Sequence, residues 1–178
     1  MEFFYGGGWK ARSMVHFQKQ GEHLVKRGMV VVLPDYRSEV MYGGTPFDCV
    51  EDAKTAMRHV RANAKRLGID PKRIAAGGGS AGGHLAAAAA TVPGLNAASD
   101  DLSVSCVPDA LVLFNPVYDN GPEGYGYERV GDRYQEISPL HNLRPGTPPT
   151  LVFLGSNDKL IPVSTAETYE AKMKDIGS

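Results

Sequence analysis

The sequence lacks several features that mark whole classes of protein. Its 178 residues include two cysteines, Cys49 and Cys106, which make neither a disulfide framework nor a zinc site. The formal net charge is −1 and the isoelectric point is near 6.5, so we expect no surface for nucleic acid or anionic lipid. No stretch approaches the roughly 18 consecutive apolar residues of a membrane span.

Targeting and metal-binding patterns are also missing. Residues 1–5 lead directly into Gly6-Gly7-Gly8, so the chain is expected to begin inside a strand, without a signal peptide and with the cytoplasm as default compartment. The acidic pairs at residues 51–52 and 100–101 have no further ligands at a suitable spacing. We therefore expect solvated carboxylates there, and neither a metal nor a cofactor.

Strand-like and helix-like patterns alternate along the chain. Strands are predicted at residues 2–5, 29–33, 74–76, 110–114 and 150–154. Those at residues 29–33, 110–114 and 150–154 are apolar enough to be buried. Helices are predicted at residues 13–27, 46–67 and from residue 84, and a capping box at 164–167 predicts the last one. Alternation of this kind predicts a single α/β domain over residues 1–178, a mostly parallel sheet of about five strands flanked by helices. Ligand chemistry is then expected at the carboxyl ends of the strands.

A nucleophile-elbow pattern lies at the end of the third predicted strand. Gly78-Gly79-Ser80-Ala81-Gly82 follows that strand and precedes an alanine-rich run that begins at His84. In this context the pattern G-x-S-x-G presents a serine hydroxyl above a parallel sheet. Glycines flank the serine because so sharp a turn leaves no room for a Cβ atom. N–H groups at the start of the next helix are free to bind an anion formed at the serine.

Four further motifs occur in the order in which one enzyme family carries them. They are Tyr5-Gly6-Gly7-Gly8-Trp9, Asp35-Tyr36-Arg37, residues 70–74 and residues 155–162. Together with the elbow they resemble the α/β-hydrolase fold, in particular carboxylesterases of the hormone-sensitive-lipase-like and the feruloyl- or acetyl-xylan-esterase-like kind. The resemblance covers nearly the whole chain. It implies hydrolysis of a small-molecule carboxylic ester through an acyl-serine intermediate, with no cofactor.

The resemblance also implies roles by position. Ser80 would be the nucleophile, and Asp158 would be the acid that orients a histidine. The backbone amides of Gly7, Gly8 and Ala81 would form the oxyanion hole. Aromatic residues near these motifs are candidates for contact with the substrate, namely Trp9, Tyr36, Tyr125 and Tyr127.

The chain departs from the family pattern in three places. Tyr5 stands where the glycine motif usually begins with histidine, and the two leading strands are absent. The final strand and the catalytic histidine are also absent, because none of the twenty residues after Asp158 is histidine. We therefore expect a core truncated at both ends, with the histidine beyond Ser178 and little or no activity from this chain alone.

None of the five histidines present is predicted to replace the missing one. His16, His23 and His59 fall on predicted helix surfaces, and His84 lies one helical turn past Ser80 and is expected to be structural. His141 lies in the long loop before the last strand, and it could reach the serine only if that loop rearranged.

Two other functions compete with esterase activity. Residues 77–82 also fit the dinucleotide fingerprint G-x-G-x-x-G, with Asp100 or Asp101 at roughly the spacing of its acidic partner. This hypothesis leaves Gly6–Gly8 and Asp158 unexplained. The other alternative is an inactive, truncated hydrolase fold in which Ser80 only caps a helix.

The predicted sheet would have two unprotected edges. In the family's strand order, residues 29–33 and 150–154 would both lack their outer neighbours. Each run is apolar and free of proline, which favours pairing with another chain. We expect a homo-oligomer joined through these sheet edges.

Overall fold

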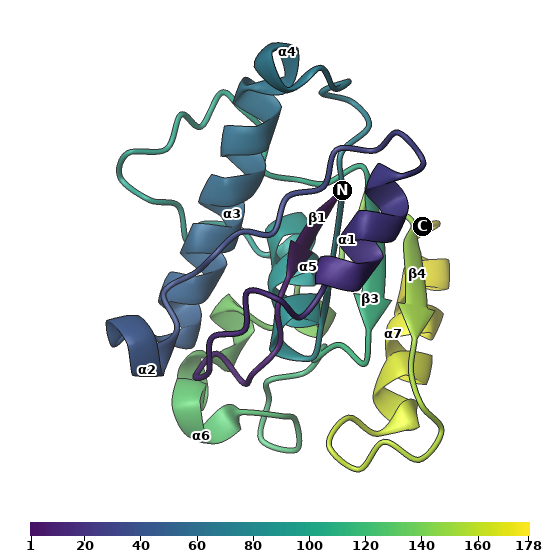
Figure 1. The fold of residues 1–178 in the computed structure, drawn as a ribbon. Coiled ribbons are helices and arrows are strands. Elements are labelled where there is room, and N and C mark those ends of the chain that lie inside the picture. The colour runs from purple at the N-terminus through teal and green to yellow at the C-terminus, as the bar shows by residue number, and fades with distance from the viewer.

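A computed structural model describes residues 1–178, which form a parallel four-stranded sheet between helices (Figure 1). The strands are β1 (Glu2–Phe4), β2 (Ala75–Gly79), β3 (Ala110–Phe114) and β4 (Thr150–Phe153), and they neighbour one another in chain order. All three pairings are parallel, so every strand ends at the same edge of the sheet. The predicted α/β fold is confirmed.

Helices cover both faces of this sheet. They are α1 (Gln18–Val25), α2 (Glu39–Tyr42), α3 (Pro46–Ala62), α4 (Ala64–Leu67), α5 (Ala81–Thr91), α6 (Tyr127–Val130) and α7 (Val163–Asp175), with 3₁₀ turns η1 (Gly131–Glu136) and η2 (Pro139–His141). Alternation along β1 sends Phe3 toward Phe17 beside α1, at 4.8 Å between ring centroids, and Phe4 into the core on the other face. None of the helices is long and apolar enough to cross a membrane.

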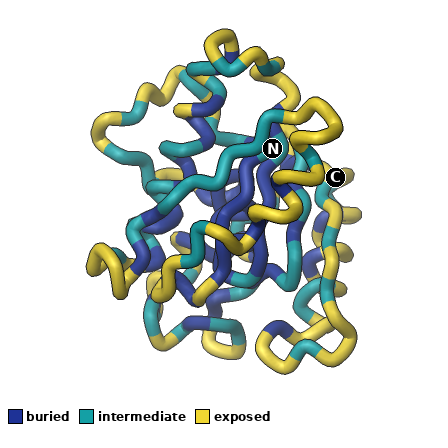
Figure 2. The backbone as a smooth tube through the Cα atoms, viewed as in Figure 1, coloured by how far each residue is buried: buried dark blue, intermediate teal, exposed yellow.

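Helix α5 lies at the centre of the molecule, and each of its eleven residues is buried. Figure 2 shows the buried positions concentrated along the central strands and this helix. Its run of alanines and glycines carries no bulky side chain except Leu85 and His84, which lets the helix approach the sheet closely. Because α5 starts directly after β2, this close packing fixes the position of Ser80 between them.

Helix α3 follows its sequence pattern closely. Thr45 is the N-cap, and a capping box forms as Thr45 Oγ1 accepts from the Asp48 N–H at 3.3 Å and the Asp48 carboxylate accepts from the Thr45 N–H at 2.8 Å. The apolar side of the helix is buried at Val50, Ala53 and Met57. One break occurs at Asn63, after which α4 completes the last turn.

Three predicted elements differ in the structure. Residues 29–33 form one bridge, between Val32 and Glu2, instead of a buried strand, and Met29 is 40% exposed. A strand that has a neighbour on just one side forms few inter-strand hydrogen bonds. Residues 14–17 form turns, so the first helix begins at Gln18. The capping box at residues 164–167 does not form, because α7 already begins at Val163 after Pro162.

Strand β4 lies at the other edge and was expected to be buried. Leu151 and Phe153 are instead 54% and 50% exposed, whereas Val152 and Thr150 face the core side. The alternation of the strand explains the difference, since α7 covers one face of β4 and no helix covers the other.

Candidate active site

Ser80 occupies a strained turn between β2 and α5. Its backbone angles are φ 53° and ψ −122°, a conformation that residues other than glycine rarely adopt. Its backbone is held by neighbours: the N–H donates to Phe114 O at 2.9 Å, and the carbonyl accepts from His84 N–H at 3.0 Å. The side chain does not cap α5 and is partly exposed. The hydroxyl is therefore presented at the carboxyl edge of the sheet and not used for folding.

The residues that flank Ser80 must be glycines because the turn has no room for a Cβ atom, as the sequence predicted. A Cβ on Gly82 would lie under 3.0 Å from the carbonyl oxygens of Phe4 and Tyr5, and one on Gly78 equally close to the backbone of Gly82. Real Cβ contacts are essentially never so short. Backbone of this protein therefore fills the space over the glycines, where a dinucleotide phosphate would have to approach. Asp100, the acidic partner in that hypothesis, is buried in an ion pair with Arg58 at 2.8 Å.

The loop after β1 leaves two backbone donors free. Gly7 and Gly8 have φ of +135° and +61°, which glycine adopts without strain. The Gly7 carbonyl accepts from the N–H groups of Lys10 and Ala11 at 3.1 and 3.0 Å, and the Gly8 carbonyl accepts from the Arg129 guanidinium. The N–H groups of Gly7 and Gly8 make no such bond. Ala81, the first residue of α5, also has no intrahelical acceptor for its N–H.

Asp158 lies in the loop after β4, at the same edge of the sheet as Ser80. Its Oδ1 accepts from the N–H groups of Leu160 and Ile161 at 2.8 and 3.0 Å. These bonds hold the carboxylate against its own loop. Oδ2 is left for another donor. One strand, β3, separates β2 from β4, so the two loops begin roughly 10 Å apart.

His84 is committed to the core. It is fully buried, its Nδ1 accepts from Trp9 Nε1–H at 3.3 Å, and its Nε2–H therefore donates to Ile137 O at 2.9 Å. Burial lowers the pKa of this imidazole to about 4. Both ring nitrogens are occupied, in agreement with the structural role predicted for His84.

A second serine, histidine and aspartate cluster does not have the geometry of a triad. His141 Nδ1 lies 2.8 Å from Ser138 Oγ and 3.8 Å from Asp119 Oδ1. A catalytic histidine instead bonds the acid through one nitrogen and the nucleophile through the other. The Ser138 hydroxyl is also fully buried and donates to Tyr118 O at 3.1 Å.

The aromatic candidates for substrate contact fall into two groups. Trp9 and Tyr36 are 1% and 2% exposed, so they support the glycine loop from inside and do not face a ligand. Tyr125 and Tyr127 are partly exposed, in or beside α6. The Tyr125 hydroxyl lies 3.3 Å from the place a Cβ would take on Gly8, which puts it beside the free amides.

Sequence reasoning missed two residues that hold this loop. His16 was expected on a helix surface, but in the turn before α1 it accepts from the Gly6 N–H through Nδ1 at 3.0 Å. Arg129 reaches Gly8 from 121 residues away and stacks over the Trp9 ring at 5.9 Å. No local pattern marks either contact, because both depend on how distant segments meet.

The segment after β1 is further anchored at Asp35. Its carboxylate accepts from Tyr5 Oη at 2.7 Å, from Arg12 Nε at 2.6 Å and from Tyr42 Oη at 2.8 Å. Burial alone would raise the pKa of the Asp35 carboxyl, but these hydrogen bonds outweigh it and hold the pKa below the usual range. Tyr5 thus ties the glycine motif to the segment that carries Tyr36.

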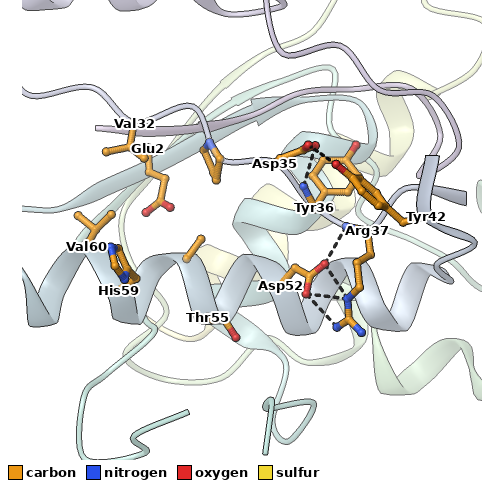
Figure 3. A pocket seen from close by; sticks show the side chains of 12 residues that line it. Glu2, Val32, Asp35, Tyr36, Arg37, Tyr42, Asp52, Thr55, His59 and Val60 are labelled. Atoms are coloured by element: carbon orange, nitrogen blue, oxygen red, sulfur yellow. Dashed lines mark hydrogen bonds and ion pairs between the residues drawn. The ribbon is translucent and has the colours of Figure 1, made fainter. Parts of the chain in front are cut away.

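A groove of about 500 Å³ lies between this segment and α3, away from the elbow. Figure 3 shows the Asp52 carboxylate accepting hydrogen bonds from Arg37 on one side of this groove. It also shows the Glu2 carboxylate pointing from β1 toward α3. Glu2 is 1% exposed, and neither carboxylate oxygen has a hydrogen-bond partner. Burial raises the pKa of this carboxyl to about 8.

Comparison with known proteins agrees with this arrangement. The model of the BD-FAE family matches residues 3–109, which include the glycine loop and the elbow. The chain belongs to the BD-FAE family. Its relatives identify it as an α/β-hydrolase of the carboxylesterase kind. Esterase LipC of Mycobacterium tuberculosis is 32% identical over 98% of this chain and 48% of its own length.

Solved structures of related esterases superpose closely. Esterase 2 of Thermogutta terrifontis phosphoramylated by tabun has 42% identity and a TM-score of 0.94, over 99% of this chain and 67% of its own. The propionate-bound form of that esterase has 41% identity and a TM-score of 0.93, over 99% and 68%. The chain thus spans about half the length of the curated relatives and about two thirds of these structures.

Proposed function

We propose that this protein is a carboxylic-ester hydrolase in which Ser80 is the acyl-accepting nucleophile. The observation that carries the proposal is the combination of a partly exposed serine side chain on a strained elbow with unbonded backbone donors near it. In the proposed reaction Ser80 Oγ attacks the ester carbonyl carbon and forms a tetrahedral intermediate. The alcohol then leaves, and water hydrolyses the acyl-serine.

The amides of Gly7, Gly8 and Ala81 are the proposed oxyanion hole. The carbonyls of Gly7, Gly8 and Ser80 accept hydrogen bonds. These bonds hold the backbone that carries the three donors in place before the substrate arrives. Donors fixed in this way pay no reorganisation cost when negative charge develops, and each contributes of the order of 3 kcal/mol to the transition state. The N-terminus of α5 adds its dipole at the same point.

Asp158 is the proposed acid, and its free oxygen would hold the imidazole of a catalytic histidine. None of the five histidines is available for this place. His23 lies on α1 beside Met1 and Ala75, at the amino ends of the strands. His59 lines the groove beside Glu2. His84 has both nitrogens bonded, and His141 bonds Ser138. His16 accepts the Gly6 N–H through Nδ1, so its proton is on Nε2 and it has no lone pair for the serine proton. We therefore expect slow turnover that added imidazole accelerates.

Esters of short acyl chains are the proposed substrates. The related Thermogutta esterase 2 has been solved with propionate and with butyrate bound. In this protein Tyr125 adjoins Gly8, so an acyl or alcohol group held at the proposed oxyanion hole would meet its ring. Tyr127, two residues after Tyr125 and at the start of α6, would contact a larger alcohol.

An aryl ester assay tests the proposal. Cleavage of p-nitrophenyl butyrate should be slow, should rise with added imidazole, and should fall to the solution rate in Ser80→Ala. Asp158→Asn should keep the serine-dependent acylation but lose most of the acceleration by imidazole. Equal rates for the wild type and Ser80→Ala at every imidazole concentration would contradict the proposed function.

A further inference from the structure

One peptide group at the entrance of the glycine loop is held at both of its polar atoms. The carbonyl of Tyr5 accepts from Tyr36 Oη at 2.9 Å. The N–H of Gly6, on the same peptide, donates to His16 Nδ1 at 3.0 Å. The two partners come from different segments, one before α1 and one before α2. With both ends fixed, this peptide plane cannot rotate without breaking a hydrogen bond.

The orientation of this peptide sets that of the amides that follow. Gly7 and Gly8 have no side chains to pack, and glycine backbones have the widest range of conformations. Their carbonyls are held downstream by Lys10, Ala11 and Arg129. The Tyr5–Gly6 peptide is the upstream anchor, so the free N–H groups are fixed from both sides.

The His16 ring is well placed for this contact. It stacks on Phe17 at 4.7 Å, and Phe17, 4% exposed, stacks in turn on Phe3 of β1. A Cβ on Gly6 would lie 3.3 Å from both His16 Cε1 and Ser80 Cβ, so the imidazole and the serine adjoin the same glycine. His16 therefore acts at the border of the site through the backbone.

Tyr36 is equally suited to donate. Its ring stacks on that of Tyr5 at 4.1 Å, and burial raises the pKa of its hydroxyl above the usual range. The hydroxyl therefore stays protonated and can donate to the Tyr5 carbonyl at any working pH. Tyr5 is itself fixed through its own hydroxyl, which donates to Asp35.

We propose that His16 and Tyr36 are positioning residues that clamp the Tyr5–Gly6 peptide and thereby aim the Gly7 and Gly8 amides at the substrate oxygen. The proposal rests on the proposed function of Ser80. It assigns to the side chain of residue 16 a single requirement, an acceptor at the position of Nδ1.

Asparagine and glutamine distinguish this requirement from general packing. In His16→Asn the amide oxygen takes the position of Nδ1, whereas in His16→Gln the polar atoms reach only the position of Nε2. Tyr36→Phe removes the other half of the clamp. His23→Asn, at an exposed histidine on α1, is the matched control. Amide hydrogen exchange of Gly6, followed by NMR, reports the clamp. The rate at which paraoxon phosphorylates Ser80 in the presence of imidazole, followed by mass spectrometry, reports the site.

We expect Gly6 to be protected in the wild type, His16→Asn and His23→Asn, and to exchange at least tenfold faster in His16→Gln. Phosphorylation of Ser80 should fall about tenfold in His16→Gln and Tyr36→Phe, and should be restored to within threefold in His16→Asn. Unchanged Gly6 exchange in His16→Gln, or unchanged phosphorylation in both weakened variants, would overturn the clamp while leaving Ser80 as the nucleophile. If the wild type is not phosphorylated at Ser80, the proposed function fails first, and the positioning role with it.

Discussion

At the scale of single residues, the protein has a strained backbone at Ser80 and a buried carboxyl without a hydrogen-bond partner at Glu2. Ser80 holds a φ of 53° because the strand–turn–helix connection requires it, not because serine favours it. Strain of this kind costs of the order of 1–3 kcal/mol and persists only where the surroundings impose it. Here the neighbouring glycines and the bonds to Phe114 and His84 impose it.

Replacing the nucleophile by glycine should therefore stabilise the fold. We expect Ser80→Gly to be about 1 kcal/mol more stable than Ser80→Ala, because glycine adopts the turn without strain and loses part of the gain through its greater unfolded-state entropy. The two variants remove the hydroxyl alike, so their comparison isolates the backbone. Urea unfolding measures the difference, and a less stable Ser80→Gly would show that the turn is not strained.

Glu2 is the second residue that lowers the stability of the fold, because its carboxyl is buried without a hydrogen-bond partner. It should make the free energy of unfolding depend on pH. Its pKa in the folded protein is about 8, above the ordinary value of 4.5. Between these values the folded state binds more protons than the unfolded state, so the free energy of unfolding falls as pH rises through this window. The stabilisation is complete below pH 4.5 and lost near pH 8.

Glu2→Gln should remove this dependence. At pH 5 we expect the variant and the wild type to be similar, and at pH 8 we expect the variant to be more stable by roughly 3 kcal/mol. Glu123→Gln, at an exposed and unpaired carboxylate, is the control and should change little at either pH. A stability difference between Glu2→Gln and the wild type that stays constant from pH 5 to pH 8 would contradict the account.

At the scale of elements, patterns with a local cause were predictable. Thr45 and Pro46 start α3 because the cap and the proline act on neighbouring residues, and Gly78–Gly82 form the elbow because the turn excludes Cβ atoms. Residues 29–33 were predicted as a buried strand from composition, but pairing depends on neighbours that the pattern does not encode. The candidate site divides in the same way: Ser80 and Asp158 follow from motifs, whereas His16 and Arg129 follow from tertiary contacts.

The packing of α5 on β1 gives a sharp test of the elbow. Gly82→Ala would place a methyl group against the carbonyls of Phe4 and Tyr5, which are backbone atoms that cannot move aside. We expect a loss of about 3 kcal/mol or more in stability. Gly155→Ala has nothing within 4 Å of its Cβ and no positive φ, so it should stay within about 0.5 kcal/mol of the wild type. Equal melting temperatures for the two variants would show that α5 does not pack as described.

At the scale of the whole molecule, β4 is the most exposed sheet edge. Its outer side has no paired strand, and Leu151 and Phe153 lie open on one face. An apolar edge of this kind favours association with another chain. The opposite edge, at residues 29–33, pairs through one bridge only and offers fewer aligned groups than was expected from the sequence.

We therefore expect a homo-oligomer that forms through β4. Light scattering of dilute protein should give a mass above 19.1 kDa, and Leu151→Lys should return the monomer, because a charge on the exposed face opposes its burial. Leu102→Lys, at another exposed leucine in the loop after α5, is the control and should leave the mass unchanged. A wild type that is monomeric under these conditions would rule out association through this edge.

The central claim, that Ser80 is the reactive nucleophile, is tested most directly by mapping a covalent adduct. The protein would be incubated with excess paraoxon and imidazole, which supplies the missing base, and its mass and peptides would be analysed by mass spectrometry. We predict one adduct per chain, on Ser80, absent in Ser80→Ala and retained in Ser138→Ala, where the second serine and histidine cluster is removed. An unmodified wild-type protein, or an adduct on Ser138 in place of Ser80, would contradict the account.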